Sequence, residues 1–342
     1  MSSSNRNVTL QDVANASGLS LITVSRSLRQ PDMVQPGTRE RVQRAIDETG
    51  YLPNLTARAL VSRRSGMIGV VVPILASSLF ADFAQGVAAQ LRKHDRQMLL
   101  GVSNRSVDDE FEVIKTFIGR QADAIIVTGF THSDACRELL NRFDGPVVET
   151  WNLRSDAIDM CVGYDNYKAS EAMTRYLLSK GYRRIAMVGG AFENNDQATD
   201  RRDGFLATMA KAGIHVPSSH VVSVPNPTTI DSGKQALLQL MQGAEPPDAI
   251  FFQAEIPAHG AMMACLSEGL SVPDDVALAG FGDLSLSEHL PVPLTTIRLR
   301  AHDMGYRAAC MVLTDLDDKQ ANEASSARQY DIGFEIIERQ SA

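Results

Sequence analysis

The feature that most constrains the fold is an alternation, from Met67 onward, of short apolar runs with longer stretches of helical length such as residues 80–94. The apolar runs read MIGVVVP, QMLLGVS, ADAIIVTG, GPVVETW, RRIAMVGG, PDAIFFQA and DVALAGFG. Continuous apolar runs are typical of strands that are buried on both faces, and crossover helices join such strands in parallel. The pattern therefore predicts an α/β core built from parallel sheets.

This alternation is too long for one domain, since the chain has 342 residues and single cores rarely exceed about 250–300. We expect residues 66–342 to form two doubly wound parallel-sheet subdomains. The segments CVGYDNYKAS and PLTTIRL lie where the chain would pass between them, and residues 322–326 are expected to form a loop. The predicted N-subdomain comprises residues 66–163 and 295–326, and the predicted C-subdomain comprises residues 164–294 and 327–342.

Polar and aromatic side chains follow the ends of the apolar runs, where parallel α/β sheets bind ligands. Amides, hydroxyls, an arginine and an aromatic face are suited to a polyol. Each residue alone is equally typical of a surface or capping position, so the prediction depends on their joint placement. The predicted effector-binding residues are Ser77, Ser78, Phe80, Asn104, Arg105, Glu149, Trp151, Asn195, Gln197, Arg201, Glu255 and Asp283. Ser103, Asn194 and Gln253 follow the same runs.

Charge separates the first 64 residues from the rest of the chain. They contain nine arginines and no lysine against five acidic residues, a surplus of four positive charges, whereas the whole chain carries −8. The remainder therefore carries −12. A basic head on an acidic body suits a local contact with DNA.

The head has the pattern of a helix-turn-helix. Thr9 and Ser20 are suitable N-caps for two short helices, and Gly18 permits the sharp turn between them. A third helix is expected to begin at Pro36 and end at Gly50, behind the weak N-cap Gln35. In this motif the second helix enters the major groove.

The second helix carries the candidate DNA contacts. Leu21, Ile22 and Arg26 point outward, and Arg26 is suited to guanine, while Thr23 and Ser25 are suited to phosphates. Thr9 is included as the cap of the first helix. The spacing alone is also compatible with a three-helix bundle that contacts another protein. Residues 54–65 are good helix formers in a stretch too short to be stable alone in water.

Together these motifs resemble the lactose-repressor/galactose-repressor family of bacterial transcription regulators. The resemblance is carried by VTLQDVANASGLSLITVSRSL, VQPGTRERVQRAIDETGYLPNLTARAL, RYLLSKGYRRIAMVGG, RRDGF, VPDDVALAGFGD and PLTTIR, so it covers nearly the whole chain. It implies a DNA-binding headpiece at 1–53, a hinge helix at 54–65 that folds on DNA, and a periplasmic-binding-protein-like core that dimerises. Asn54, Ala57 and Leu60 are then expected to contact DNA, with Leu60 inserted into the minor groove.

The resemblance also bears on the effector. Arg201 in RRDGF matches the arginine with which the family contacts its effectors, and a guanidinium can hold a carboxylate or span adjacent hydroxyls. Trp151 stands where the family often has aspartate, and Ala254 and Gly282 replace polar residues usual in members that respond to sugars. PVVETWNLRSDAIDMCVGYDN and GFGD look closest to the gluconate-repressor branch, which implies a sugar acid or a phosphorylated relative. A neutral sugar or a nucleoside is the alternative.

Other classes of function find less support in the sequence. No nucleophile-elbow, zinc-protease, P-loop or dinucleotide motif is present, and Glu149 with Glu255 is the one candidate carboxylate pair for an enzyme. The four cysteines lack metal-ligand spacing, so we expect no metal, no cofactor and no catalysis. A sugar-binding protein without DNA affinity would need an export signal, which the sequence lacks. The predicted protein is a cytoplasmic homodimer, without membrane contact, on a near-palindromic DNA operator.

Overall fold

The computed structural model describes residues 8–52, 64–224, 229–321 and 328–342. The chain divides into two compact units, Met1–Ser65 and Gly66–Ala342. Within the described residues, no helix combines the length and apolar character needed to cross a membrane.

The described part of the first unit, residues 8–52 and 64–65, contains three α-helices and one 3₁₀ turn. They are α1 (Leu10–Ser17), α2 (Leu21–Arg29), η1 (Pro31–Met33) and α3 (Pro36–Thr49). α1 ends at Gly18, whose φ of +64° is the left-handed conformation that glycine adopts readily. The helices enclose a small apolar core of Val13, Ala14, Val24, Val42 and Ala45. The predicted caps Thr9 and Ser20, and Pro36 as the first residue of α3, are confirmed.

The second unit contains two six-stranded sheets. The first has the order β11-β5-β4-β3-β1-β2, and all of its neighbouring strands are parallel. Its strands are β1 (Met67–Val72), β2 (Gln97–Val102), β3 (Ala124–Thr128), β4 (Val147–Thr150), β5 (Met160–Gly163) and β11 (Gln329–Asp331).

The second sheet has the order β12-β10-β9-β8-β6-β7 and is parallel except for the pair β10–β12. Its strands are β6 (Ile185–Gly189), β7 (Val221–Ser223), β8 (Ala249–Phe252), β9 (Ala277–Gly282), β10 (Thr295–Arg298) and β12 (Glu335–Ile337). Each of the seven apolar runs contains one strand, so the predicted fold class is confirmed.

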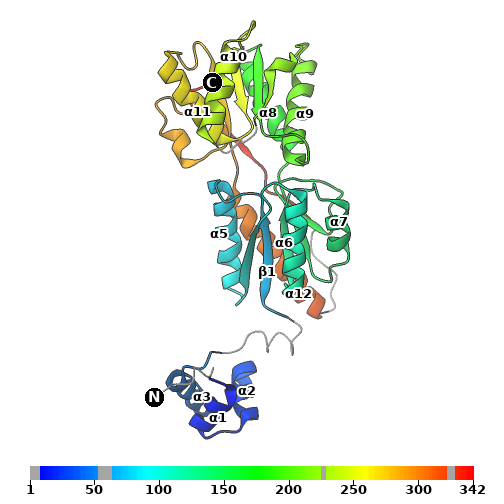
Figure 1. Cartoon of the computed structure of the whole chain (residues 1–342), viewed down its shortest axis with the longest axis vertical. Coiled ribbons are helices and arrows are strands. Elements are labelled where there is room, and N and C mark those ends of the chain that lie inside the picture. Colours follow the sequence, from blue (N-terminus) through cyan, green and yellow to red (C-terminus); the bar gives the residue numbers. More distant parts are fainter. Residues whose placement is uncertain (1–7, 53–63, 225–228, 322–327) are drawn as a thin grey trace. The chain divides into compact units, whose positions relative to one another are not determined.

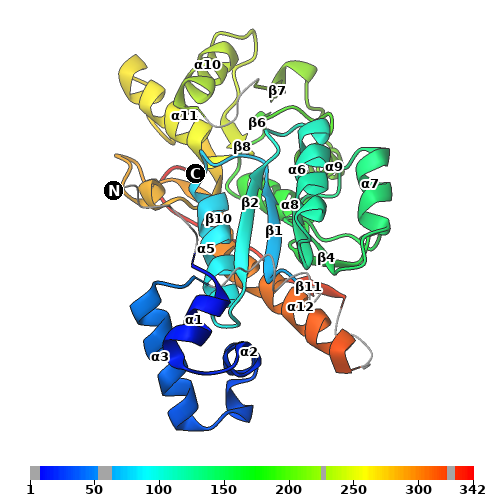
Figure 2. The same ribbon diagram turned by 60° about the horizontal axis from the view of Figure 1, so that its bottom comes forward.

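Helices cover both faces of each sheet (Figures 1 and 2). α5 and α12 cover one face of the first sheet and α6 and α7 the other, while α8 and α9 oppose α10 and α11 across the second. The helices are α5 (Ser78–Arg92), α6 (Val107–Gly119), α7 (Asp134–Asn141), α8 (Asn166–Ser179), α9 (Asp196–Lys211), α10 (Ile230–Met241), α11 (Glu255–Glu268) and α12 (Ala301–Ala321). The described residues of this unit also form two 3₁₀ turns, η2 (Ser218–His220) and η3 (Ser285–Glu288).

The boundaries between the two halves differ by a few residues from the prediction. Residues 295–298 form β10, which pairs in register with β9 of the second sheet, and residues 329–331 form β11, which pairs with β5 of the first. The chain therefore crosses between the halves after residue 298 and after residue 331, not at 295 and 327. The predicted loop at 322–326 lies outside the described residues.

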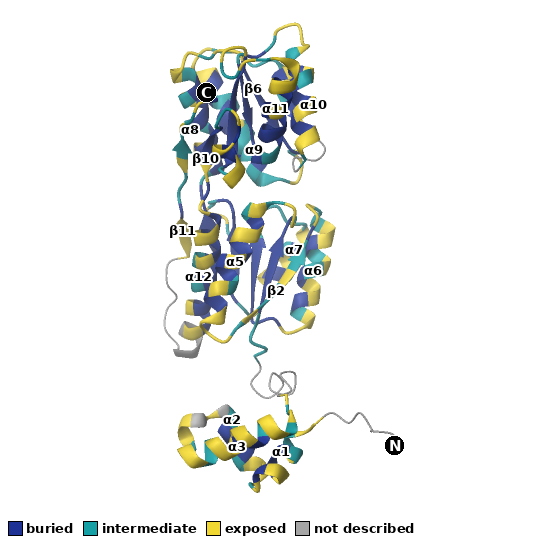
Figure 3. Ribbon diagram, turned by 90° about the vertical axis from the view of Figure 1, so that its left-hand side faces the viewer, coloured by how far each residue is buried: buried dark blue, intermediate teal, exposed yellow. Residues whose placement is uncertain are grey.

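Three apolar clusters form the core of this unit, and the strands at their centre are buried (Figure 3). The largest cluster includes residues of both halves. α5 and α12 approach closely at Gly86 and Gly305, because a Cβ at Gly86 would lie 2.1 Å from the His302 carbonyl oxygen and one at Gly305 would lie 2.0 Å from that of Phe83. Only glycine fits at such a crossing.

Candidate functional site

The predicted DNA-reading helix α2 presents the expected outer face. Leu21 and Ile22 are 43% and 71% exposed, and Arg26 is exposed as well. Thr23 and Ser25 are half-buried. Two large apolar side chains held in water at the start of a helix are unfavourable unless a partner covers them.

Side chains near this face fix where the first two helices begin. The backbone N–H of Thr23 donates to Ser20 Oγ at 3.2 Å, and the two hydroxyls lie 2.8 Å apart. At Thr9 both the backbone N–H and the hydroxyl donate to the Asp12 carboxylate, at 2.8 and 2.7 Å. The predicted contacts Asn54, Ala57 and Leu60 lie outside the described residues.

In the second unit, a cavity lies between the carboxyl ends of the two sheets. Its empty volume, which includes open solvent, is about 610 Å³. We call it the central cavity. It is lined by Ile74, Ser77, Leu79, Phe80, Arg105, Trp151, Tyr164, Gln197, Arg201, Gln253, Ala254, Glu255, Ile256, Phe281, Leu284 and Leu299. The structure thus brings together seven of the predicted effector residues: Ser77, Phe80, Arg105, Trp151, Gln197, Arg201 and Glu255.

Three lining residues hold polar atoms that are buried without a hydrogen-bond partner among the described residues. These atoms are Trp151 Nε1, Arg201 Nε and Gln253 Oε1. A buried polar group left unpaired costs about 1–3 kcal/mol. Two donors and one acceptor on residues that line the central cavity are therefore unsatisfied by the described part of the protein.

The walls of the cavity are aromatic and rigidly supported. The ring of Trp151 packs on Phe80 and Phe83, with centroids 4.7 and 5.7 Å apart. Trp151 adopts a φ of +71°, and its carbonyl oxygen accepts from Asn166 Nδ2 at 2.8 Å. Asn166 Oδ1 in turn accepts from Arg201 at 3.2 Å, so one buried amide orients two residues of the site.

The electrostatic character of the cavity is set by two arginines. The pKa of Arg105 is lowered from its ordinary value, mainly by desolvation and also by repulsion from Arg201, although part of the Arg105 side chain is exposed. Desolvation also lowers the pKa of Arg201, whose guanidinium lies over the ring of Phe281 at 4.6 Å from its centroid. Two neighbouring guanidiniums that are disfavoured in this way would gain from an anion between them.

Glu255 is the acidic residue that lines the cavity, and it is only 3% exposed. Its carboxyl group accepts hydrogen bonds from the hydroxyls of Ser287 and, at 2.7 Å, of Thr296. Desolvation outweighs these bonds and raises the pKa of Glu255 to about 7. Ser287 also contacts His259 Nε2 at 2.8 Å, and burial lowers the pKa of that imidazole to about 4. Below pH 7 the cavity therefore carries mainly the charge of its arginines.

A second, adjoining cavity shares Arg105 and Gln197 with the first and has an empty volume of about 970 Å³, open solvent included. The predicted residues Asn104 and Asn195 line it. Asn195 Oδ1 caps α9 by accepting from the N–H of Ala198 at 3.1 Å.

The structure places the remaining predicted residues elsewhere. Ser78 and Asp283 line a neighbouring hollow, and Asp283 forms ion pairs with Arg298 at 2.6 Å and Arg339 at 2.7 Å. Glu149 is fully buried away from both cavities, so it does not form a carboxylate pair with Glu255.

The partners of Glu149 explain its position. Its carboxylate accepts from the N–H of Ile158 at 2.5 Å and lies 3.3 Å from His132 Nε2. Burial alone would lower the pKa of His132, but hydrogen bonds to Cys136, Glu110 and Glu149 outweigh it and raise the pKa to about 11.

Tyr164 and Phe281 are the main lining residues that the sequence did not single out. Both are buried, and their rings lie 6.1 Å apart. Burial raises the pKa of Tyr164 to about 12. Tyr164 directly follows β5, and Phe281 lies near the end of β9, so their positions at strand ends were the available signal.

Comparison with known proteins shows one family in which a DNA-reading helix and a ligand-binding core occur in the same chain. Residues 9–54 match the family described as "Bacterial regulatory proteins, lacI family", and residues 174–342 match "Periplasmic binding protein-like domain". The chain is 32% identical over 334 residues to the HTH-type transcriptional regulator GntR of Pseudomonas aeruginosa, covering 97% of this chain and 95% of the relative. The chain belongs to the lacI family of bacterial transcriptional regulators.

Solved structures support the same assignment for the fold of this lacI-family regulator. A LacI-family transcriptional regulator from Silicibacter pomeroyi superposes with a TM-score of 0.88 at 28% identity, covering 98% of this chain and 99% of that one. The transcription regulator GntR from Chromobacterium violaceum gives a TM-score of 0.75 at 29% identity, covering 80% and 98%. The predicted function, a DNA-binding transcriptional regulator with an effector domain, is confirmed.

Proposed function

We propose that the effector of this regulator is a sugar acid such as gluconate, or a phosphorylated relative, bound in the central cavity. The observation that carries the proposal is the convergence of Trp151 Nε1, Arg201 Nε and Gln253 Oε1, all buried and unpartnered, on a cavity with two arginines. The arginines suit a carboxylate or phosphate, and the tryptophan donor and glutamine acceptor suit hydroxyls. The similarity to the gluconate-repressor branch supports the same chemistry.

Calorimetry on the full chain tests this choice. Gluconate and 6-phosphogluconate should bind at least about tenfold more tightly than glucose or a nucleoside, because only the acids place a negative charge between the guanidiniums. Binding of neutral hexoses or nucleosides, with no binding of the acids, would contradict the proposal.

Arg201→Ala isolates the main contact. Loss of a hydrogen bond to a charged group costs about 1.5–3 kcal/mol, so acid binding should weaken roughly 10- to 150-fold while operator affinity without effector is unchanged. Arg202→Ala is the matched control, because the neighbouring guanidinium pairs with Asp203 at 2.8 Å and does not line the cavity. Equal weakening in both variants would remove Arg201 from the site.

For the DNA side, we propose a cytoplasmic homodimer that represses by binding a near-palindromic operator. One headpiece reads only a few base pairs, and a twofold dimer doubles the contact area and matches a palindrome. The exposed pair Leu21 and Ile22, with Arg26, is suited to base edges. Closure of the central cavity on its ligand would alter the spacing of the two headpieces and so the operator affinity.

Gel shifts and sedimentation test this part independently of the effector. Specific binding should fall steeply between low and moderate salt, since phosphate contacts release counterions, and should require the dimer. A chain that sediments as a monomer on and off DNA, or that binds every duplex equally, would refute the dimeric operator model.

A further inference from the structure

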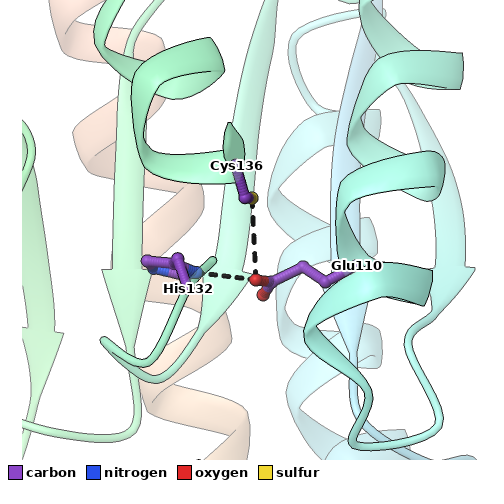
Figure 4. Close-up of side chains that lie close together, drawn as sticks. All are labelled: Glu110, His132 and Cys136. Carbon is purple, nitrogen blue, oxygen red and sulfur yellow. Dashed lines mark hydrogen bonds and ion pairs between the residues drawn. The ribbon is translucent and has the colours of Figure 1, made fainter. Parts of the chain in front are cut away.

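A second cluster of reactive side chains lies outside the effector cavity, in the half that contains the first sheet (Figure 4). Glu110 on α6, His132 in the β3–α7 connection and Cys136 on α7 each direct one donor atom to a common point. Glu110 Oε2 lies 2.7 Å from His132 Nδ1 and 3.7 Å from Cys136 Sγ. All three donor atoms lie within 4.8 Å of one another.

These separations are close to those of a metal site. Zinc binds sulfur at about 2.3 Å and nitrogen or oxygen at about 2.0–2.2 Å, so tetrahedral donors stand roughly 3.3–3.7 Å apart. The sulfur–oxygen separation already fits, and the oxygen–nitrogen separation needs an opening of at least about 0.6 Å. Small rotations of side chains are sufficient for that change.

The imidazole has the support that metal-bound histidines show. With Nδ1 facing Glu110 and Cys136, the other nitrogen, Nε2, faces Glu149 Oε1 at 3.3 Å. The second oxygen of Glu149 is held by the N–H of Ile158. A carboxylate on the far side of the ring fixes the tautomer and orientation of a ligating histidine.

The backbone around the cluster is also fixed. Ser133 caps α7 by accepting from the N–H of Cys136 at 3.2 Å, and Ser106 caps α6 by accepting from that of Asp109. The donor atoms of Glu110 and Cys136 are thus held on capped helices and lose little freedom when they bind an ion.

Charge balance and access favour the same assignment. A divalent ion, a thiolate, a neutral imidazole and the buried carboxylates of Glu110 and Glu149 sum to −1. This equals the charge of the metal-free cluster with a protonated imidazole and a thiol, so binding adds no net charge to these buried side chains. Glu110 also lines the adjoining cavity, which places one of the three ligands beside a solvent-connected space.

We propose that Glu110, His132 and Cys136 bind one divalent transition-metal ion, with zinc preferred. Thiolate and imidazole ligands select zinc over magnesium or calcium, and three protein ligands leave a fourth position for water. The ion would join α6 to the start of α7 and raise the stability of the metal-bound chain.

The test uses the full chain, stripped with a chelator and dialysed against zinc or cobalt. We expect about one zinc per chain by elemental analysis, and cobalt should produce a sulfur-to-metal charge-transfer band in the near ultraviolet. The band reports ligation by a cysteine thiolate in the unaltered chain, so this first result does not depend on whether a variant folds. A chain without bound zinc, or cobalt bound without this band, would overturn the proposal and leave a buried ion-pair cluster.

Variants locate the site. Cys136→Ser should abolish the cobalt band and the zinc-induced rise in melting temperature, and Glu149→Gln should weaken zinc binding roughly 10- to 100-fold while retaining the band. Cys161→Ser is the matched control, because this buried cysteine on β5 donates to the Arg154 carbonyl oxygen at 3.6 Å and is not one of the three clustered donors. Loss of the band in Cys161→Ser but not in Cys136→Ser would place the metal elsewhere and refute the assignment.

Discussion

Glu255 provides the sharpest test of the energetics, because its carboxyl group is nearly fully buried and still ionises within an accessible pH range. Its pKa rises from 4.5 to about 7 in the folded chain. Since a tenfold change in a proton-binding constant corresponds to about 1.4 kcal/mol, ionised Glu255 should cost the fold about 3 kcal/mol. Glu255→Gln keeps the shape of the protonated carboxyl group and removes this cost.

The sign follows from proton binding. Between pH 4.5 and 7 the folded state holds a proton on Glu255 that the unfolded state has released, so stability falls as pH rises through this window. Glu255→Gln should therefore match the parent at pH 4.5 and melt roughly 6 °C higher at pH 8. Scanning calorimetry at both pH values, on the transition of the second unit, measures the difference.

Glu268→Gln is the control, since it lies exposed at the end of the same helix. It should show the same difference from the parent at both pH values. If Glu255→Gln also differs from the parent by a constant amount at pH 4.5 and pH 8, Glu255 does not titrate in this window and the desolvation argument fails. If the proposed acid effector is right, the parent should also bind it less tightly at pH 8 than at pH 6, whereas Glu255→Gln should not.

Three further perturbations probe packing, DNA binding and the contact between the halves. Gly305→Ala should lower the melting temperature by roughly 5 °C, because the new Cβ would lie 2.0 Å from the Phe83 carbonyl oxygen. Gly119→Ala is the control and should not lower the melting temperature, because nothing lies within 4 Å of its new Cβ. Equal melting temperatures for the two variants would refute the close helix contact. Leu60→Gly should weaken operator binding roughly 10- to 100-fold in gel shifts and leave effector affinity unchanged, and parental operator affinity would count against an inserted leucine. Asp196→Ala removes the hydrogen bonds that its carboxylate accepts across the two halves from Phe130 N, Thr131 Oγ1 and Asn152 Nδ2. Effector affinity measured by calorimetry should therefore fall roughly tenfold. An unchanged affinity would show that this contact does not stabilise the bound form.

The sequence predicted most of the strands that are buried along their length, but it missed β5, which is buried at all four of its residues and is too short to stand out as an apolar run. The strands that it predicted are continuous apolar runs, whereas β11 is exposed at all three of its residues and has no apolar pattern to detect. β10 was recognised as a segment between the halves but assigned to the wrong one. Which sheet β10 joins depends on its pairing with β9 and β12, and the local sequence of β10 does not indicate these partners.

Asp283 shows a second limit of sequence reasoning. It follows a strand and carries a charge, as a ligand-binding residue would. Its partners Arg298 and Arg339 come from β10 and from the C-terminal segment, so only the tertiary structure reveals that the carboxylate is already paired. The proposed metal ligands were likewise not detectable from local sequence spacing, since Glu110 lies 22 residues before His132 and only the tertiary structure brings them together.

The pleat of the strands explains which strand-end residues reach the central cavity. Side chains alternate between the two faces of a strand, and the cavity lies on the face that carries the largest apolar cluster. Phe251 belongs to that cluster, so Gln253, two residues later, faces the cavity.

On β4 the same alternation directs the side chain of Glu149 away from the central cavity. Val148 lies in the largest cluster and Val147 in the cluster beneath α6 and α7, so Glu149 points to His132. Trp151 would share that direction, but its φ of +71° turns the chain and returns its ring to the cavity. One unusual backbone angle therefore separates a residue of the effector cavity from a residue of the proposed metal site, although they lie two positions apart.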